Sequence, residues 1–201
     1  LLLLTIFYSN ILFAQVCNTF MSEDVPKTIP SQGTVFSVLV TTGGTITDVN
    51  VVDLIGTHTY VQDLVFILTS PEGTSVTLIE NQCDWVDDFD LTIDESGSPV
   101  LPCPFNDGGT YTTQNSDGTS LNDFIGESSQ GTWTLAIIDG VDGDMGQLNS
   151  WGLEICTYLC PDDIVTVNDP GENGAVITYM MPSPTGVALT QIDESGLTSG
   201  D

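Results

Sequence analysis

The chain of 201 residues contains 28 Asp and Glu but a single Lys or Arg, Lys27, so its formal net charge is −27. A surface with this charge repels phosphate groups, which argues against nucleic-acid binding and against anionic membrane surfaces. Hydrophobic residues make up 40% of the chain, and its 20 Gly and 10 Pro indicate an all-β protein with a sizeable core and many turns.

The first predicted element is an apolar segment, LLLLTIFYSNILFAQ, over residues 1–15. It is too short to be a good membrane span, and Ser9 and Asn10 interrupt it. It resembles the hydrophobic region and cleavage zone of a secretory signal peptide, with the small residue Ala14 near its end. We expect a partial signal peptide here, the alternative being a buried N-terminal strand. A secreted or cell-surface protein follows from this expectation, and in such a protein disulfides can form.

Four segments further along the chain alternate apolar and polar residues, which is the period of a half-buried β-strand. The apolar stripes are Leu64, Phe66 and Leu68; Val76 and Leu78; Trp133, Leu135 and Ile137; and Trp151, Leu153 and Ile155. Clusters of Gly, Asp, Asn and Ser between them are typical of loops. The pattern predicts a jelly-roll-like β-sandwich. Trp133 and Trp151 could stack on a ligand, but their place at the start of a stripe favours core packing.

The chain has five cysteines, Cys17, Cys83, Cys103, Cys156 and Cys160. No two of them form a Cys-x-x-Cys pair, and the single histidine is distant in sequence, which argues against a zinc site. Four cysteines can close two bridges in three ways. We favour Cys17–Cys156, which would join the first strand to the last, and Cys83–Cys103, which would close a long acidic loop. Cys160 is then left over.

A series of short motifs runs from residue 58 to residue 151. They are His58-Thr59-Tyr60, Asp63-Leu64, Ser70-Pro71-Glu72-Gly73-Thr74, Gly131-Thr132-Trp133-Thr134-Leu135, Asp139, Gly143-Asp144-Met145-Gly146, Leu148 and Ser150-Trp151. In order and spacing they resemble the P domain, also called Homo B, of subtilisin-like proprotein convertases. The resemblance covers roughly Val16 to Tyr158 and departs from the family at Gln62, where many members have Gly.

The resemblance implies a jelly-roll-like β-sandwich over residues 16–158. It also implies a structural signature within that sandwich. The signature residues are His58, Thr59, Asp63, Ser70, Pro71, Gly73, Trp133, Asp139, Gly146 and Trp151.

The segment after residue 158 contains Cys-Pro-Asp-Asp-Ile from Cys160, Asn-Asp-Pro-Gly from Asn168 and Gly-Ala-Val from Gly174. In these motifs residues 159–201 resemble the start of a hyalin repeat, an immunoglobulin-like module of extracellular proteins. Glu172 and Asn173 stand where that module commonly has a Cys. Because two strands around one turn are too few to close a core, we expect a truncated immunoglobulin-like module here.

His58 is the only histidine of the chain, so it is the only imidazole that could act as a general base. A Ser-His-Asp triad needs a serine nucleophile, and the chain has no Gly-x-Ser-x-Gly motif, since the segment 126–131 has the wrong spacing. The resemblance places His58 in the structural signature. We expect it to be hydrogen-bonded at a strand edge, with Asp63 as its partner or as a cap on backbone N–H groups. No catalytic site is expected in this chain, although the family is associated with serine-type endopeptidases.

Two acidic loops are candidates for calcium, the only cofactor that we expect. One contains Asp84, Asp87 and Asp88, and the other contains Asp139, Asp142 and Asp144. Calcium takes roughly six to eight oxygen ligands, and clustered carboxylates without Lys or Arg neighbours repel one another unless a cation intervenes. Neither loop is an EF-hand, and the alternative is that these aspartates are solvated turn formers.

Two function classes remain open. The first is a non-catalytic, stabilising or interaction module of a secreted or cell-surface multidomain protein, with partners among its own other domains, extracellular proteins or glycans. The second is an accessory domain of a subtilisin-like serine endopeptidase whose catalytic domain lies outside this fragment. The signal-like segment directly before residue 16 leaves no room for a preceding catalytic domain, which favours the first class.

Overall fold

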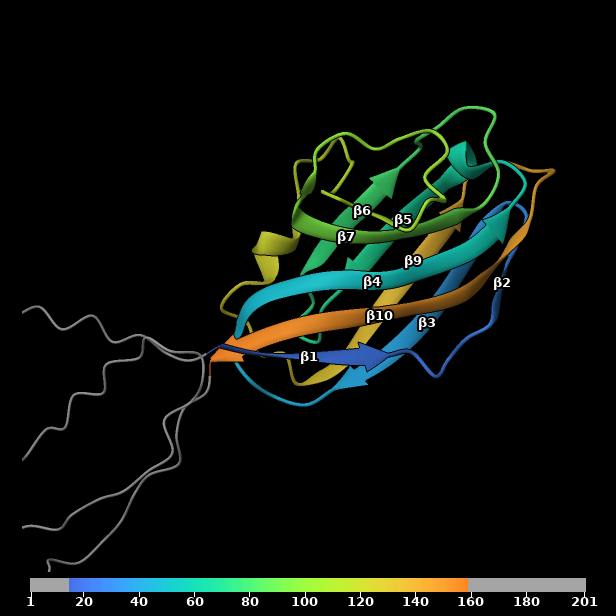
Figure 1. The fold of residues 1–201 in the computed structure, drawn as a ribbon. Coiled ribbons are helices and arrows are strands. Elements are labelled where there is room, and N and C mark those ends of the chain that lie inside the picture. The colour runs from blue at the N-terminus through green and yellow to red at the C-terminus, as the bar shows by residue number, and fades with distance from the viewer. Residues whose placement is uncertain (1–14, 159–201) are drawn as a thin grey trace, which may run out of the picture. The chain divides into compact units, whose positions relative to one another are not determined.

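The computed structural model describes residues 15–158, which form ten strands and two short 3-10 helices (Figure 1). In chain order they are β1 (Gln15–Met21), β2 (Lys27–Ile29), β3 (Gly33–Thr41), β4 (Ile46–His58), η1 (Val61–Asp63), β5 (Leu64–Thr69), β6 (Ser75–Glu80), β7 (Phe89–Ser98), β8 (Gly109–Tyr111), η2 (Leu121–Phe124), β9 (Gly131–Asp139) and β10 (Gly146–Tyr158). None of the helices in this part of the chain is long and apolar enough to cross a membrane.

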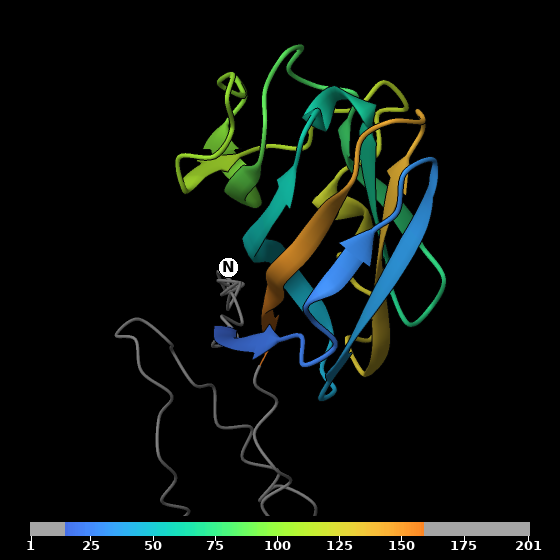
Figure 2. The ribbon, with the colours of Figure 1, turned by 90° about the vertical axis from the view of Figure 1, so that its right-hand side faces the viewer.

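The strands form two sheets that pack against each other (Figures 1 and 2). The larger sheet has the order β1-β10-β4-β7-β8, with β2 also paired to β10, and the smaller sheet has the order β3-β9-β5-β6. β4 runs antiparallel to β10, and β9 runs antiparallel to both β3 and β5, whereas β7 and β8 are parallel. The predicted all-β sandwich is confirmed. Of the expected signal segment over residues 1–15, residues 1–14 lie outside the described residues, as does the expected immunoglobulin-like module, and Gln15 is the first residue of β1.

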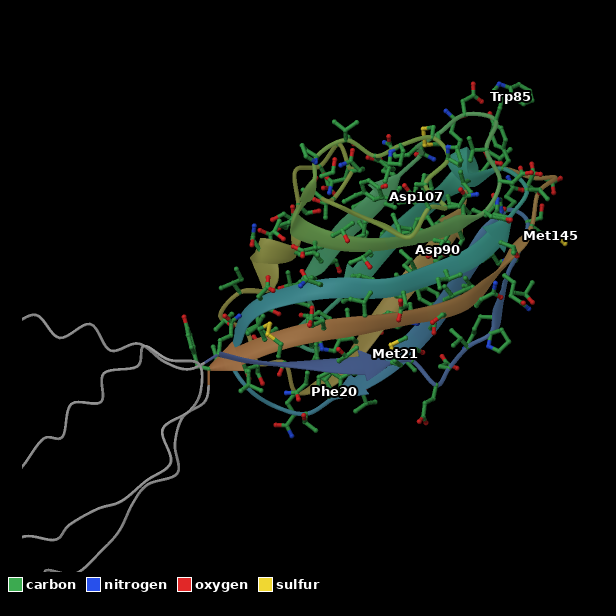
Figure 3. The ribbon with its side chains drawn as sticks, in the orientation of Figure 1. Phe20, Met21, Trp85, Asp90, Asp107 and Met145 are labelled. Atoms are coloured by element: carbon green, nitrogen blue, oxygen red, sulfur yellow. A yellow bond between two sulfur atoms is a disulfide. The ribbon has the colours of Figure 1, made fainter. Side chains whose placement is uncertain are left out.

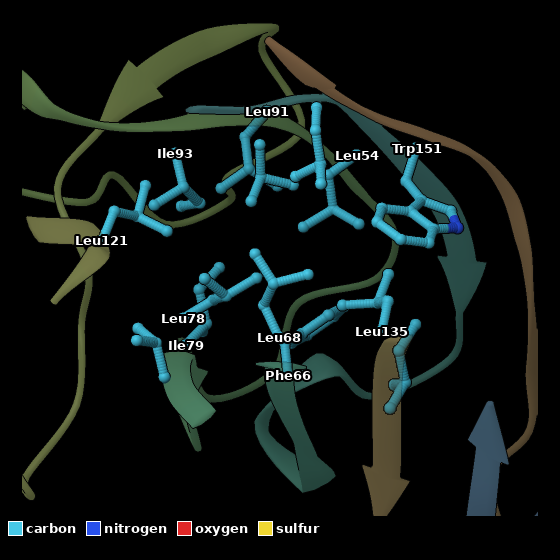
Figure 4. Close-up of a cluster of buried hydrophobic side chains, with 14 of the residues drawn as sticks. Leu54, Phe66, Leu68, Leu78, Ile79, Leu91, Ile93, Leu121, Leu135 and Trp151 are labelled. Atoms are coloured by element: carbon cyan, nitrogen blue, oxygen red, sulfur yellow. The ribbon is translucent and has the colours of Figure 1, made fainter. Parts of the chain in front are cut away.

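The core lies between the sheets and is filled by every second residue of the strands. Trp133, Leu135 and Ile137 of β9 have no exposed surface, and side chains from both sheets meet in the interior (Figure 4). Phe66 of the smaller sheet and Phe89 of the larger sheet form an edge-to-face pair with ring centroids 5.1 Å apart. Each such side chain contributes about 1.5–3 kcal/mol on burial, so the alternating pattern is what stabilises these segments as strands.

Two disulfides join the same cysteine pairs that the sequence favours. Cys17–Cys156 connects β1 to its neighbour β10, across 139 residues of chain. Cys83–Cys103 connects the segments on either side of β7, across 20 residues. Cys160 lies outside the described residues.

Candidate functional site

His58 and Asp139 form a hydrogen bond between the two sheets. His58 is the last residue of β4 in the larger sheet, and Asp139 is the last residue of β9 in the smaller sheet. The Nε2 atom of His58 lies 3.2 Å from Oδ2 of Asp139, and neither side chain has any exposed surface. The pair therefore fastens the sandwich at the end where β4 and β9 finish.

Both ring nitrogens of His58 have partners within the domain. Because a carboxylate only accepts hydrogen bonds, Nε2 carries the proton that it shares with Asp139. Nδ1 lies 3.2 Å from the backbone N of Tyr60 and 2.9 Å from its O. A neutral ring accepts from this N–H, and a charged ring donates to this carbonyl. In either protonation state the imidazole is enclosed and engaged.

Asp63 is not the hydrogen-bond partner that the sequence predicts for His58, because the stacking of the sheets brings Asp139 to the ring instead. Asp63 ends η1 and is 7% exposed, and within the described residues its carboxylate neither caps that helix nor accepts another hydrogen bond. Burial raises the pKa of Asp63, and the negative charges of Asp139 and Asp144 raise it further, while His58 lowers it in part. The carboxylate of Asp63 is thus placed unfavourably for a charged group.

Replacing Asp63 by Asn is expected to stabilise the domain at pH 7 but not at acidic pH. Because the pKa of Asp63 is raised in the folded state, its protonated carboxyl adds to the free energy of unfolding. This contribution is fully present below the unfolded-state pKa, about 3.9, and is lost as the pH rises through the folded-state pKa. Asn carries no charge, so its advantage appears only above this range. Thermal melting of both chains between roughly pH 3 and pH 8 measures the difference.

The control for this comparison is Glu23→Gln, which removes one negative charge from an exposed position. A gain in melting temperature for Asp63→Asn that is as large at pH 3 as at pH 7 would contradict the electrostatic explanation.

Of the six aspartates proposed for calcium, Asp87 accepts from the Asn106 side-chain amide on its backbone carbonyl, and the other five accept hydrogen bonds on the carboxylate. Their carboxylates accept hydrogen bonds from the Tyr60 hydroxyl (Asp84), the His58 amide (Asp88), the His58 ring (Asp139), the Ser31 hydroxyl (Asp142) and the Thr59 hydroxyl (Asp144). Among the described residues, no three His, Cys, Asp or Glu side chains are grouped as a metal ion requires. Calcium binding stays a prediction, and a higher melting temperature in calcium than in magnesium at equal ionic strength would support it.

Three of the signature residues, Ser70, Pro71 and Gly73, form the turn between β5 and β6 at the opposite end of the sandwich. The amide of Gly73 donates to the carbonyl of Ser70 at 3.0 Å, and Gly73 has a φ of +96°, which glycine adopts without strain. The hydroxyl of Ser70 donates to Glu127 at 2.7 Å, and Thr74 donates to the same carboxylate. The sequence analysis missed Glu127, because no local pattern marks a lone Glu in a loop as the acceptor for a distant turn.

Trp133, Trp151 and Gly146 act in strand packing. Both indoles are buried and donate hydrogen bonds, Trp133 to a backbone carbonyl at 3.2 Å and Trp151 to the Ser37 hydroxyl at 2.9 Å. A Cβ atom on Gly146 would lie 1.9 Å from the backbone oxygen of Thr57 in β4. Only glycine therefore allows β10 to begin beside the end of β4.

Trp85 is an exposed aromatic residue that the sequence analysis did not single out. Its side chain, labelled in Figure 3, is 85% exposed. Its ring forms an edge-to-face pair with the Tyr60 ring at a centroid distance of 5.7 Å. Its φ of +59° is uncommon for a bulky residue, and Cys83 and Asp88 on the same loop also have positive φ. Such backbone geometry depends on tertiary contacts, so the sequence carries no direct signal for it.

Comparison with known proteins gives one family match and several structural similarities. A family model described as "Proprotein convertase P-domain" matches residues 47–155, more than half of the chain. A serine protease of Aeromonas sobria, solved in complex with the chaperone ORF2, is 20% identical with a TM-score of 0.51, over 73% of this chain and 28% of that chain. A comparison with curated proteins found no significant match.

Two further structures are less similar. Another structure of the Aeromonas sobria serine protease is 20% identical with a TM-score of 0.48, over 73% of this chain and 28% of that chain. A beta-porphyranase of glycoside hydrolase family 86 from Bacteroides plebeius is 13% identical with a TM-score of 0.41, over 76% of this chain and 22% of that chain.

The residues in the family match contribute to both ends of the sandwich. Residues 47–155 include β4 without its first residue, all of β5 to β9 and most of β10, and with them His58, Asp139 and the β5–β6 turn. The chain spans less than a third of the Aeromonas protease, and at 20% identity that similarity shows the fold alone. On the family match, this chain belongs to the proprotein convertase P-domain family.

Proposed function

We propose that this P domain is a non-catalytic module that stabilises or binds other parts of an extracellular or cell-surface multidomain protein. The observation that carries the proposal is the position of His58. A general base must come within about 3 Å of the proton that it removes. The His58 ring has no exposed surface, and both of its nitrogens are bonded inside the domain, which supports a structural role for it.

The proposed organisation is a signal peptide over residues 1–15, the P domain over residues 16–158 and a hyalin-repeat-like module over residues 159–201. Two disulfides support an extracellular setting, because such bonds persist in oxidising compartments. The similarity to 28% of a longer protease chain supports a multidomain setting, because there this fold is one part of a larger protein.

The second candidate is an accessory domain of a subtilisin-like serine endopeptidase. The family match favours it, because the family takes its name from proprotein convertases, and the similar Aeromonas protein is a serine protease. In this case the domain would stabilise a catalytic domain elsewhere in the full-length protein. A subtilisin-like domain anywhere in the full-length reading frame would favour this candidate over the first.

Incubation of the purified chain with labelled casein is expected to release no peptides, with a known serine protease as the positive control. The reason is that the one imidazole is unavailable as a base. Turnover that is lost in the His58→Ala variant or in the Ser128→Ala variant, while each variant keeps its circular dichroism spectrum, would refute the non-catalytic proposal.

A further inference from the structure

The outer surface of the smaller sheet is free of charge over most of its area. We define the uncharged face as the uncharged outward side chains of its four strands; Glu80, the last residue of β6 and the partner of Val65, lies at its end. They are Thr34, Phe36, Val38 and Val40 of β3; Thr132, Thr134, Ala136 and Ile138 of β9; Val65, Ile67 and Thr69 of β5; and Ser75 and Thr77 of β6. The strand register places Phe36 beside Ala136 and Ala136 beside Ile67, so these residues form continuous rows.

Large apolar side chains on this face are open to solvent. Phe36 is 58% exposed and Val40 is 70% exposed, although both belong to a regular strand, β3. Single exposed apolar residues are ordinary on soluble proteins, but contiguous ones mark interaction sites. The rows across three strands make the uncharged face a contiguous patch.

The outer surface of the larger sheet has the opposite character. Its outward residues include acidic side chains on β4, β7 and β10, among them Asp90, which is labelled in Figure 3. They are Asp48, Asp53, Asp90, Asp94 and Glu154. Among the outward side chains of the two sheets, acidic residues thus lie mainly on the larger sheet, whereas most other acidic residues of the described part lie in loops. Solubility alone would not require this segregation.

The edges of the smaller sheet are partly closed, so contact through the face is favoured over strand addition. In the middle of β3, the amide of Val38 donates to Asp24 and its carbonyl accepts from Ser22. Beside β6, the backbone of Gln114 bonds to Leu78 and Glu80. A strand that adds to a sheet edge needs a row of unpaired backbone amides and carbonyls. These contacts interrupt that row at the β3 edge and at the β6 edge.

Carboxylates surround the uncharged face. They are Asp24 beside β3, Glu80 at the end of β6, Asp117 in the loop bonded to β6, and Glu127 beside the β5–β6 turn. The only basic residue of the sequence, Lys27, is already paired with Asp24 at 2.9 Å. The patch therefore has an apolar centre and an acidic rim.

We propose that the uncharged face docks onto another folded protein surface that has an apolar centre and Lys or Arg residues at its rim. A second copy of this chain would place one ring of carboxylates against another, and facing like charges oppose association. A basic rim pairs with this ring, while the apolar centre removes water from Phe36 and Val40. This inference rests on the proposed function and names the surface and the partner chemistry for it. A standard interface uses roughly 20–30 residues on each side, so the acidic rim must take part in the contact together with the four strands.

Site-specific photo-crosslinking tests the inference in the full-length protein, expressed in its own cells. Phe36 is replaced by p-benzoylphenylalanine, and the cross-linked peptides are identified by mass spectrometry. Position 100 is the matched control, because Val100 is apolar and 73% exposed but lies outside the uncharged face. We expect a cross-link at position 36 to a Lys- or Arg-bearing surface, well above the yield at position 100. Phe36→Ser should then weaken binding of that identified partner by about tenfold or more, and Val100→Ser should not.

Three results would overturn the inference: equal yields at positions 36 and 100, a cross-link to a second copy of the chain, or a cross-link to residues 1–14 or 159–201. Failure of the proposed function gives a different signal. Casein turnover by the purified chain would remove the non-catalytic assignment without changing the cross-linked peptide.

Discussion

Replacing Asp139 by Ala is expected to lower the free energy of unfolding by about 3–5 kcal/mol, because two hydrogen bonds to a buried carboxylate are lost at about 1.5–3 kcal/mol each. The Nε2–H of His58 would then have no acceptor in a region without solvent. The amide of Val141 would also lose its acceptor, since it donates to Oδ1 of Asp139 at 3.0 Å. Denaturant unfolding followed by tryptophan fluorescence measures the loss.

Asp139→Asn is the matched control, because it keeps the shape and removes the charge. The Asn oxygen can accept from Val141, and the Asn amide can donate to Nε2 if the His58 proton moves to Nδ1. That nitrogen would then donate to the Tyr60 carbonyl, 2.9 Å away. A smaller loss of about 1–2 kcal/mol is expected for Asn. Equal losses for Ala and Asn would mean that the charge, and not the hydrogen bond, determines the effect.

Replacing both Cys17 and Cys156 by Ala is expected to cost up to about 5 kcal/mol of stability, against about 3 kcal/mol for replacing Cys83 and Cys103. The difference arises in the unfolded chain. The first bridge closes 139 residues and the second closes 20, and a longer closed loop removes more conformational freedom from the unfolded state.

Denaturant unfolding of the two double variants, each with Cys160→Ser to prevent disulfide exchange, compares the bridges directly. Should the Cys83 and Cys103 variant be the less stable one, local fixing of the loop around Trp85 would outweigh the entropy of the unfolded chain.

The strand pattern is readable where one face of a strand is buried and the other is polar. Leu64, Phe66 and Leu68 alternate with residues that face outward, and the period of two follows from the pleat. The alternation of apolar and polar residues does not predict β3, and the reason is physical. Its outward residues Phe36 and Val38 are as apolar as its inward residue Leu39, so no alternation remains. The feature that hides β3 in the sequence is the one that makes its sheet a candidate docking surface.

The partner of His58 is not readable from the sequence. Spacing favours Asp63, five residues away, whereas the carboxylate at the ring is Asp139, 81 residues away on the other sheet. Which residue reaches the ring depends on how the two sheets stack, and that is a property of the whole core. The acidic loops illustrate the same limit, because Asp84 and Asp88 lie in one short loop and yet their carboxylates accept hydrogen bonds from different residues in the fold.

The Cys17–Cys156 bridge also determines how the domain responds to mechanical tension. Its two Cα atoms lie 3.9 Å apart, so the chain enters and leaves the sandwich at nearly one point. A pull on residues before Cys17 and after Cys156 passes through the sulfur atoms and leaves residues 18–155 without load. After reduction of the disulfide, tension acts on the segment between the two cysteines. That segment can then unfold and extend by roughly 460–500 Å, at about 3.3–3.6 Å per residue. In the multidomain protein proposed above, the oxidised domain would not lengthen under load, and the thiol–disulfide balance of the medium would determine whether it can.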